Sequence, residues 1–131
     1  MAERTILIAD DDLGKLKMME NIVRAAVPSA TLHIARTARD ALKMSAALGK
    51  RIDIGVIDFD FPGEGGLNGA DIVGDLRSRA PNARLACATS RRRGGMFDEA
   101  AEWTASSGAD AALCSHDADF ETELQSILAA P

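Results

Sequence analysis

Short apolar runs alternate with segments of helical periodicity along the whole chain. The runs are rich in Ile, Val, Leu and Ala, largely lack polar alternation and are too short for helices: Thr5–Ala9, Thr31–Ala35, Ile54–Ile57, Arg84–Ala88 and Ala111–Cys114. Such runs are typical of parallel strands that are covered on both faces. We therefore predict five buried strands.

Each run is followed by a segment with apolar residues at helical spacing. The first such segment stops before Pro28, the second stops at Gly49 and the third stops at Ala80, before Pro81, all of which are common helix terminators. The predicted helices are a segment with the stripe Leu16, Met19, Ile22, Val23 and Ala26, then Ala38–Leu48, a segment from about Asn68 to Ala80, about Met96–Ser106, and a segment from Asp117 or Asp119 that carries Phe120, Leu124, Ile127 and Leu128.

A strand followed by a helix, five times over, predicts an α/β fold with helices on both sides of a five-stranded parallel sheet. This is a three-layer sandwich. The five units use residues 1–131, so we expect a single domain without an appended DNA-binding or catalytic domain.

Acidic and hydroxyl side chains follow four of the predicted strands. The residues after the first, third, fourth and fifth strands are, in order, Asp10, Asp11 and Asp12, then Asp58, then Thr89 and Ser90, then Ser115 and His116. Ligands of open α/β sheets bind beyond the carboxyl ends of the strands. If the first and third strands are neighbours, Asp10, Asp11 and Asp58 converge in one pocket.

Three carboxylates in one pocket repel one another, and a hard divalent cation relieves the repulsion. Mg²⁺ suits such a site because it accepts few carboxylates, retains waters and also binds phosphate oxygens. A carboxylate placed like Asp58 can act as a nucleophile and form an acyl phosphate. The run Asp10–Asp12 could instead serve only as a helix N-cap, but Asp58 at the end of a second buried strand favours the metal site.

Composition narrows the classes of partner. Hydrophobic residues make up 47% of the chain, which is ordinary for a globular protein. The net charge is −5, so neither nucleic acid nor an anionic membrane is an expected partner. The basic run Arg91–Arg93 is predicted to be a solvated loop, and Cys87 and Cys114 are predicted to be small buried hydrophobes. No apolar stretch is long enough to cross a membrane, so we expect a cytoplasmic protein.

The strand-end motifs resemble those of the receiver domains of two-component response regulators. Ile6–Asp12 is similar to the first strand with its acidic pair, Val56–Pro62 to the strand that bears the phosphoacceptor, and Cys87–Ser90 to the strand that ends in a phosphate-sensing hydroxyl. This resemblance covers essentially the whole chain and implies a flavodoxin-like (βα)5 fold with strand order 2-1-3-4-5, which a chemotaxis member of this family also has.

The resemblance also implies roles for single residues. Asp58 would accept phosphate from a sensor histidine kinase or a histidine phosphotransfer protein. Asp11 and Asp58 would ligate Mg²⁺ directly, Asp10 would help through water, and Asp60 would contribute its backbone carbonyl. Thr89 would hydrogen-bond the phosphoryl group. The resemblance implies a signalling protein and not an enzyme. Such a domain acts by binding other proteins, and a homodimer is one possible assembly.

The chain departs from the family pattern at the end of the fifth strand. Ser115 and His116 stand where the family has Lys and Pro, and Ala112 stands in place of an aromatic switch residue. The loop Gly63–Gly69 is also longer than usual, by about three residues. We hypothesise that Arg91 or a neighbour in its loop replaces the missing cation.

Two other functions are open on the sequence alone. A degenerate receiver would signal without phosphate, as an adaptor or dimerisation module. An aspartate-based phosphatase would use Asp58 and Asp60 as nucleophile and acid/base pair, although that family has this motif on its first strand. His33, inside the second strand, is predicted to be a structural residue. His116 is predicted to be a partly exposed loop residue. Trp103 is expected either in the core or at a partner-binding surface.

Overall fold

The computed structural model describes residues 3–129 and contains one five-stranded parallel sheet in the order β2-β1-β3-β4-β5. The strands are β1 (Thr5–Ala9), β2 (Thr31–Ala35), β3 (Ile54–Ile57), β4 (Arg84–Thr89) and β5 (Ala111–Cys114). The helices are α1 (Leu13–Ala26), α2 (Ala38–Leu48), the short 3₁₀ helix η1 (Gly49–Arg51), α3 (Gly69–Arg79), α4 (Phe97–Ser107) and α5 (Phe120–Ala129). The predicted fold class and strand order are confirmed.

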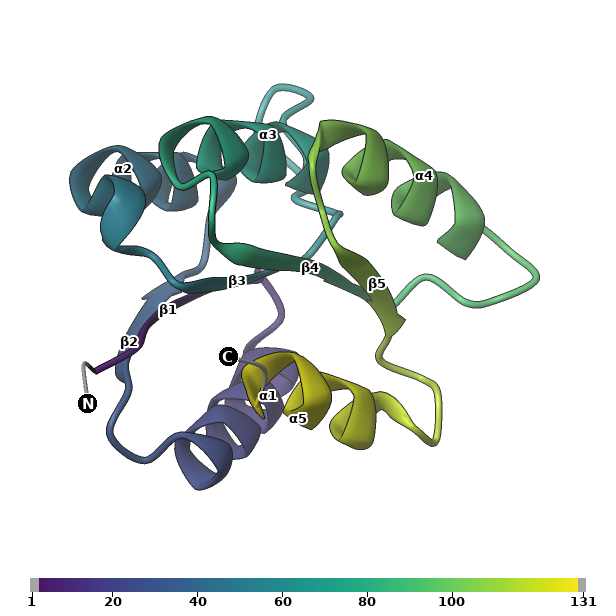
Figure 1. Ribbon diagram of the computed structural model, residues 1–131. Coiled ribbons are helices and arrows are strands. Elements are labelled where there is room, and N and C mark those ends of the chain that lie inside the picture. Colours follow the sequence, from purple (N-terminus) through teal and green to yellow (C-terminus); the bar gives the residue numbers. More distant parts are fainter. Residues whose placement is uncertain (1–2, 130–131) are drawn as a thin grey trace.

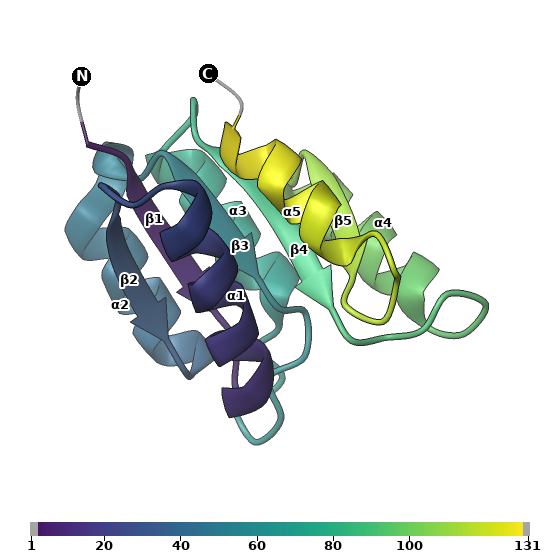
Figure 2. The same ribbon diagram turned by 90° about the horizontal axis from the view of Figure 1, so that it is seen from below.

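The helices form two layers around the sheet. Helices α1 and α5 cover one face, and α2, α3 and α4 cover the other (Figure 1); the view in Figure 2 looks onto the α1 and α5 side. Alternate residues of β1 enter the two cores, since Ile6 and Ile8 pack towards α1 and α5 while Leu7 and Ala9 pack towards α2 and α3. This explains why the strand sequences lack polar alternation: both faces are buried.

The predicted element boundaries hold with small corrections. Strand β4 ends at Thr89, one residue beyond the predicted end, because it pairs with β5 as far as the Thr89 and Cys114 positions. Helix α4 begins at Phe97, and α5 begins at Phe120, later than the predicted start at Asp117 or Asp119. The two predicted start positions, Asp117 and Asp119, lie in the bend and turn that precede α5.

The glycine-rich loop between β3 and α3 has a structural role. Its Glu64 carboxylate accepts hydrogen bonds from the backbone N–H groups of Ala38 (2.6 Å) and Arg39 (3.1 Å) at the start of α2. Gly63, Gly65 and Gly66 adopt positive φ angles, a conformation that favours glycine. The loop thereby caps a helix from a distant part of the sequence.

The two cysteines are free and buried, as predicted. Burial raises the pKa of the Cys87 thiol to about 11, so this side chain behaves as a small apolar group. Over residues 3–129, none of the helices is both long and apolar enough to span a membrane.

Candidate functional site

The carboxyl ends of β1 and β3 bring the predicted acidic residues together. Strands β1 and β3 pair directly, with Ala9 opposite Ile57, so the residues that follow them, Asp10 and Asp58, lie at the same edge of the sheet. One carboxylate oxygen from each of Asp10, Asp11 and Asp58 can be chosen so that all three lie within 4.8 Å of one another. The sequence-based prediction of an acidic pocket is therefore confirmed.

The three acids differ in exposure. Asp10 and Asp58 are 0% and 4% exposed, whereas Asp11 is exposed to solvent. Burial, and repulsion from Asp10, raise the pKa of Asp58 to about 7, although the ammonium of Lys15 lowers it. Burial also raises the pKa of Asp10, against the lowering effect of Lys15. Buried carboxylates with raised pKa values gain from any cation that joins the cluster.

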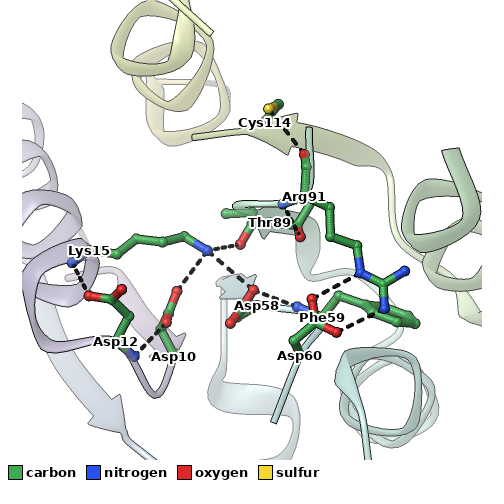
Figure 3. Close-up of polar contacts among 10 residues, drawn as sticks. Asp10, Asp12, Lys15, Asp58, Phe59, Asp60, Thr89, Arg91 and Cys114 are labelled. Atoms are coloured by element: carbon green, nitrogen blue, oxygen red, sulfur yellow. Dashed lines mark hydrogen bonds and ion pairs between the residues drawn. The ribbon is translucent and has the colours of Figure 1, made fainter. Parts of the chain in front are cut away.

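Lys15 supplies a cation within the cluster, which the sequence analysis missed. Its ammonium Nζ lies 2.9 Å from Asp10 Oδ2 and 3.2 Å from Asp58 Oδ1, and it donates to the carbonyl oxygen of Ala88 at 2.6 Å (Figure 3). The side chain is only 6% exposed. Burial would lower the pKa of Lys15, but Asp58 and Asp10 override this and raise it.

The first turn of α1 fixes the position of Lys15. The Asp12 side chain caps the helix by accepting a hydrogen bond from the Lys15 backbone N–H at 3.0 Å, and the Asp12 N–H donates to Asp10 Oδ1 at 2.9 Å. Asp12 is thus an N-cap, as the alternative interpretation of the acidic run proposed, while its two neighbours belong to the acidic cluster. The signal for Lys15 was present in the sequence: with Met19 and Ile22 it forms an i, i+4, i+7 stripe on the buried face of α1.

Asp58 is held by its own backbone neighbour as well. The Phe59 N–H donates to Asp58 Oδ1 at 2.8 Å, so Oδ1 accepts from both Phe59 and Lys15. Within residues 3–129, no hydrogen bond reaches the other oxygen, Oδ2 (Figure 3). This leaves Oδ2 as the oxygen free to act on a ligand.

Thr89 lies at the end of β4 on the other side of the cluster and is completely buried. Its Oγ1 accepts a hydrogen bond from the Arg91 N–H at 3.1 Å. The hydroxyl hydrogen is thereby directed away from that N–H and can be donated to an anion. The role of Thr89 as a phosphate-sensing hydroxyl stays a prediction.

Arg91, which with its loop neighbours was the candidate for a replacement cation, is paired with two other acids in the structure. Its guanidinium makes a two-pronged ion pair with Asp60, through Nε at 2.9 Å and Nη2 at 2.8 Å, and Nη1 lies 3.0 Å from Glu99. It also stacks on the Phe59 ring at 4.5 Å. These contacts raise the pKa of Arg91, chiefly through the hydrogen bonds to Asp60, so its charge is already committed to Asp60 and Glu99.

The Asp60 side chain is directed at Arg91 (Figure 3), and Asp60 is not among the acids of the described cluster. Trp103 is 53% exposed on α4 and meets the Phe59 ring edge-on, with centroids 6.1 Å apart. His116 is exposed in the turn after β5, as predicted, and His33 is half-buried within β2. Ala112 packs beside Phe59 and Cys87.

The cluster fits a divalent metal ion. Three carboxylates provide the hard oxygen donors that such ions prefer. Within the described residues, the partner of the buried Asp10 Oδ2 is the ammonium of Lys15, 2.9 Å away. In that same part of the chain Lys15 makes no ion pair with Asp11, so the exposed side of the cluster is open to a cation.

Comparison with known proteins places the fold. No protein-family model matches the sequence, and no curated protein matches it. Among solved structures, the BeF3-activated receiver domain of DrrB, a Thermotoga maritima OmpR/PhoB homologue, is 18% identical, with a TM-score of 0.75 over 98% of this chain and 100% of that one.

Two further structures are similar to the same degree. CheY in the CheX–CheY–BeF3–Mg²⁺ complex of Borrelia burgdorferi is 15% identical, with a TM-score of 0.76 over 95% of this chain and 86% of that one. A Burkholderia pseudomallei response regulator with a phosphorylated aspartic acid and a calcium ion is 18% identical, with a TM-score of 0.71 over 97% and 74%. The chain therefore has the fold of response-regulator receiver domains, along nearly its whole length, with an acidic cluster at the carboxyl edge of its sheet.

Proposed function

We propose that this protein is a receiver domain that accepts a phosphoryl group on Asp58 in the presence of Mg²⁺. The observation that carries the proposal is the convergence of Asp10, Asp11 and Asp58 at the carboxyl edge of the sheet. The phosphoryl donor would be a phosphohistidine of a sensor kinase or of a phosphotransfer protein. The chain itself would be a signalling protein and not an enzyme, and the cytoplasmic location stays a prediction.

The chemistry follows from the free oxygen of Asp58. Oδ2 attacks the phosphorus atom and forms a P–O bond, while the P–N bond of the phosphohistidine breaks and leaves its electron pair on the ring nitrogen. The product is an acyl phosphate on Asp58. Thr89 would donate its hydroxyl hydrogen to a phosphoryl oxygen. The buried carboxylate needs little further positioning because Phe59 and Lys15 hold Oδ1.

The metal would be held by Asp11 and Asp58, with Asp10 behind them and the carbonyl of Asp60 as a further ligand. When bound, Mg²⁺ offsets the charge of the phosphoryl oxygens during transfer. Its affinity should rise with pH, since the pKa of Asp58 is about 7 and the carboxylate must be ionised to ligate. Solved structures of the same fold contain BeF3 and Mg²⁺, or a phosphorylated aspartate and calcium, which supports a divalent cation and an aspartyl phosphate in this proposal.

The phosphatase alternative is disfavoured by the position of Asp60. An acid/base residue must face the substrate held at the nucleophile, but the Asp60 carboxylate is held by two hydrogen bonds to Arg91. The receiver proposal needs only the backbone of Asp60. If Asp58 accepts no phosphoryl group, a receiver-like adaptor that acts without phosphate is the alternative function.

Titration with beryllofluoride, a phosphoryl mimic, tests the proposal. In Mg²⁺, the wild-type protein should bind it with a change in fluorescence of Trp103, the single tryptophan, which contacts Phe59 next to Asp58. The Asp58→Asn variant, which keeps the size of the side chain, should not bind. If the wild type shows no Mg²⁺-dependent binding, the phosphate-independent adaptor becomes the better account.

A further inference from the structure

Lys15 is a buried charge that the proposed function does not yet use. It is one of the residues on the buried face of α1, beside Leu16 and Met19, and its side chain is 6% exposed. A lysine in such a place normally destabilises a fold unless its charge is paired. Its position on the apolar face of α1 therefore directs attention to the partners at the end of its side chain.

The ammonium is held from three strands at once. Asp10 follows β1, Asp58 follows β3 and Ala88 belongs to β4, and all three contacts are 3.2 Å or shorter. The hydrogen bond to the Ala88 carbonyl does not depend on the charge of the acids. It can hold the ammonium beside Asp58 whether that side chain is a carboxylate or an acyl phosphate.

Among the described residues, Lys15 is the one cation that makes an ion pair with Asp58. Arg91 is bound by Asp60 and Glu99, and the end of β5 carries Ser115 and the exposed His116 in place of a lysine. The Ser115 backbone N–H donates to the Thr89 carbonyl at 2.9 Å. The end of β5 is thus held beside the end of β4, but the Ser115 side chain carries no charge.

We propose that Lys15, delivered from α1, is the cation that pairs with the phosphoryl group on Asp58 and replaces a lysine at the end of β5. The proposal rests on the proposed function, because it needs phosphate at Asp58. Transfer turns the Asp58 carboxylate into an acyl phosphate that bears a dianionic phosphoryl group, so the cluster gains negative charge. Lys15 is within reach of these oxygens, and the exposed Asp11 side of the cluster stays open to the metal.

Opposite effects on cation and anion binding provide the test. In the Lys15→Met variant, beryllofluoride should bind in saturating Mg²⁺ about 10- to 100-fold more weakly, as expected for loss of one charge-assisted hydrogen bond. Mg²⁺ alone should bind at least as tightly as to the wild type, since a competing positive charge has been removed from the acids. A variant with a merely damaged site would lose both ligands.

Lys17→Met is the matched control, since the Lys17 side chain lies on the same helix and is 70% exposed; both affinities should be unchanged. Lys15→Arg, which keeps the charge, should bind beryllofluoride more tightly than Lys15→Met. Wild-type affinity for beryllofluoride in Lys15→Met, or equal losses of beryllofluoride and Mg²⁺, would overturn the role of Lys15.

A measurement on the unaltered protein covers the case in which Lys15→Met does not fold. The ¹⁵N resonance of the Lys15 ammonium should shift when beryllofluoride is added in Mg²⁺, and the Lys17 ammonium should not. An unchanged Lys15 resonance in a protein that binds beryllofluoride would contradict the inference. If the wild type binds no beryllofluoride at all, the failure lies with the proposed function instead.

Discussion

Replacing Lys15 with methionine should destabilise the metal-free protein in a pH-dependent way. The substitution keeps most of the apolar stem but removes the ammonium, and it leaves Asp10 and Asp58, which are almost fully buried, without their common partner. Removing one member of a buried ion pair typically costs about 3–5 kcal/mol. We expect the lower end, about 3 kcal/mol at pH 8, because Met fills the space and Asp58 can take up a proton.

For a chain of this size, about 3 kcal/mol corresponds to a fall of roughly 12 °C in Tm. The sign of the pH dependence follows from the raised pKa of Asp58, about 7 in the folded state against 3.8 for an ordinary aspartate. A group whose pKa is raised by folding favours the fold below its unfolded pKa, and this stability is lost as the pH rises through the folded value. Without Lys15 the pKa of Asp58 rises further, so the cost should be small at pH 5 and full at pH 8.

Urea unfolding without divalent ions, followed by circular dichroism at pH 5 and pH 8, measures the difference. Lys17→Met, at an exposed position of the same helix, should change stability by less than about 0.5 kcal/mol at either pH. Equal stability of Lys15→Met and wild type at pH 8 would refute the conclusion that the ammonium neutralises the two acids. A cost that is the same at both pH values would show that packing, and not charge, is lost.

Three further substitutions test other parts of the site. Asp58→Asn should make the metal-free protein more stable than wild type at pH 8, with an upper value of about 4 kcal/mol from the raised pKa of Asp58, and the gain should vanish below pH 4 in urea unfolding. Gly69→Ala should cost about 2–3 kcal/mol and weaken beryllofluoride binding, because the new Cβ would lie 2.7 Å from Phe59 Cα and against the Asp58 carbonyl oxygen; normal stability and binding would contradict this. Arg91→Ala should change beryllofluoride affinity less than twofold, because its guanidinium pairs with Asp60 and Glu99; a loss of the size expected for Lys15→Met would restore Arg91 as the phosphate-binding cation.

Much of the fold was predictable because the strands are buried on both faces. Runs such as Ile54–Ile57 are too short and too uniformly apolar to be surface helices, and their order along the chain fixes a βα repeat. The helix ends at Gly49 and Ala80 followed from local chemistry. The start of α5 was less certain because several acidic residues before Phe120 are all suitable for a first turn.

The candidate site also has a part that the sequence predicted, the three acids, and a part that it did not, Lys15. Asp10, Asp11 and Asp58 directly follow strands, so a pairing of β1 with β3 was sufficient to bring them together. Lys15 reaches the cluster because its side chain is long and α1 is angled towards the acids. Neither property can be predicted from which residues follow the strands. Its place in the apolar stripe with Met19 was nevertheless a usable signal, because a charged residue on a buried helix face requires a partner.

The hypothesis that Arg91 or a neighbour in its loop replaces the missing cation is not supported at Arg91, for a related reason. Its position after β4 suggested proximity to Asp58, but the loop directs the guanidinium across the Phe59 ring to Asp60 and Glu99. A sequence shows which residues follow a strand but not the direction in which a long side chain extends. The cation that the structure does place beside Asp58 comes from α1, as Lys15, and not from the loop after β4.

The central claim is that Asp58 accepts a phosphoryl group, and intact-mass measurement after incubation with acetyl phosphate and Mg²⁺ tests it most directly. We predict a mass increase of one phosphoryl group that hydroxylamine removes, as expected for an acyl phosphate, and that is absent without Mg²⁺ and in Asp58→Asn. An unmodified wild-type protein, or an adduct that persists in Asp58→Asn, would contradict the claim.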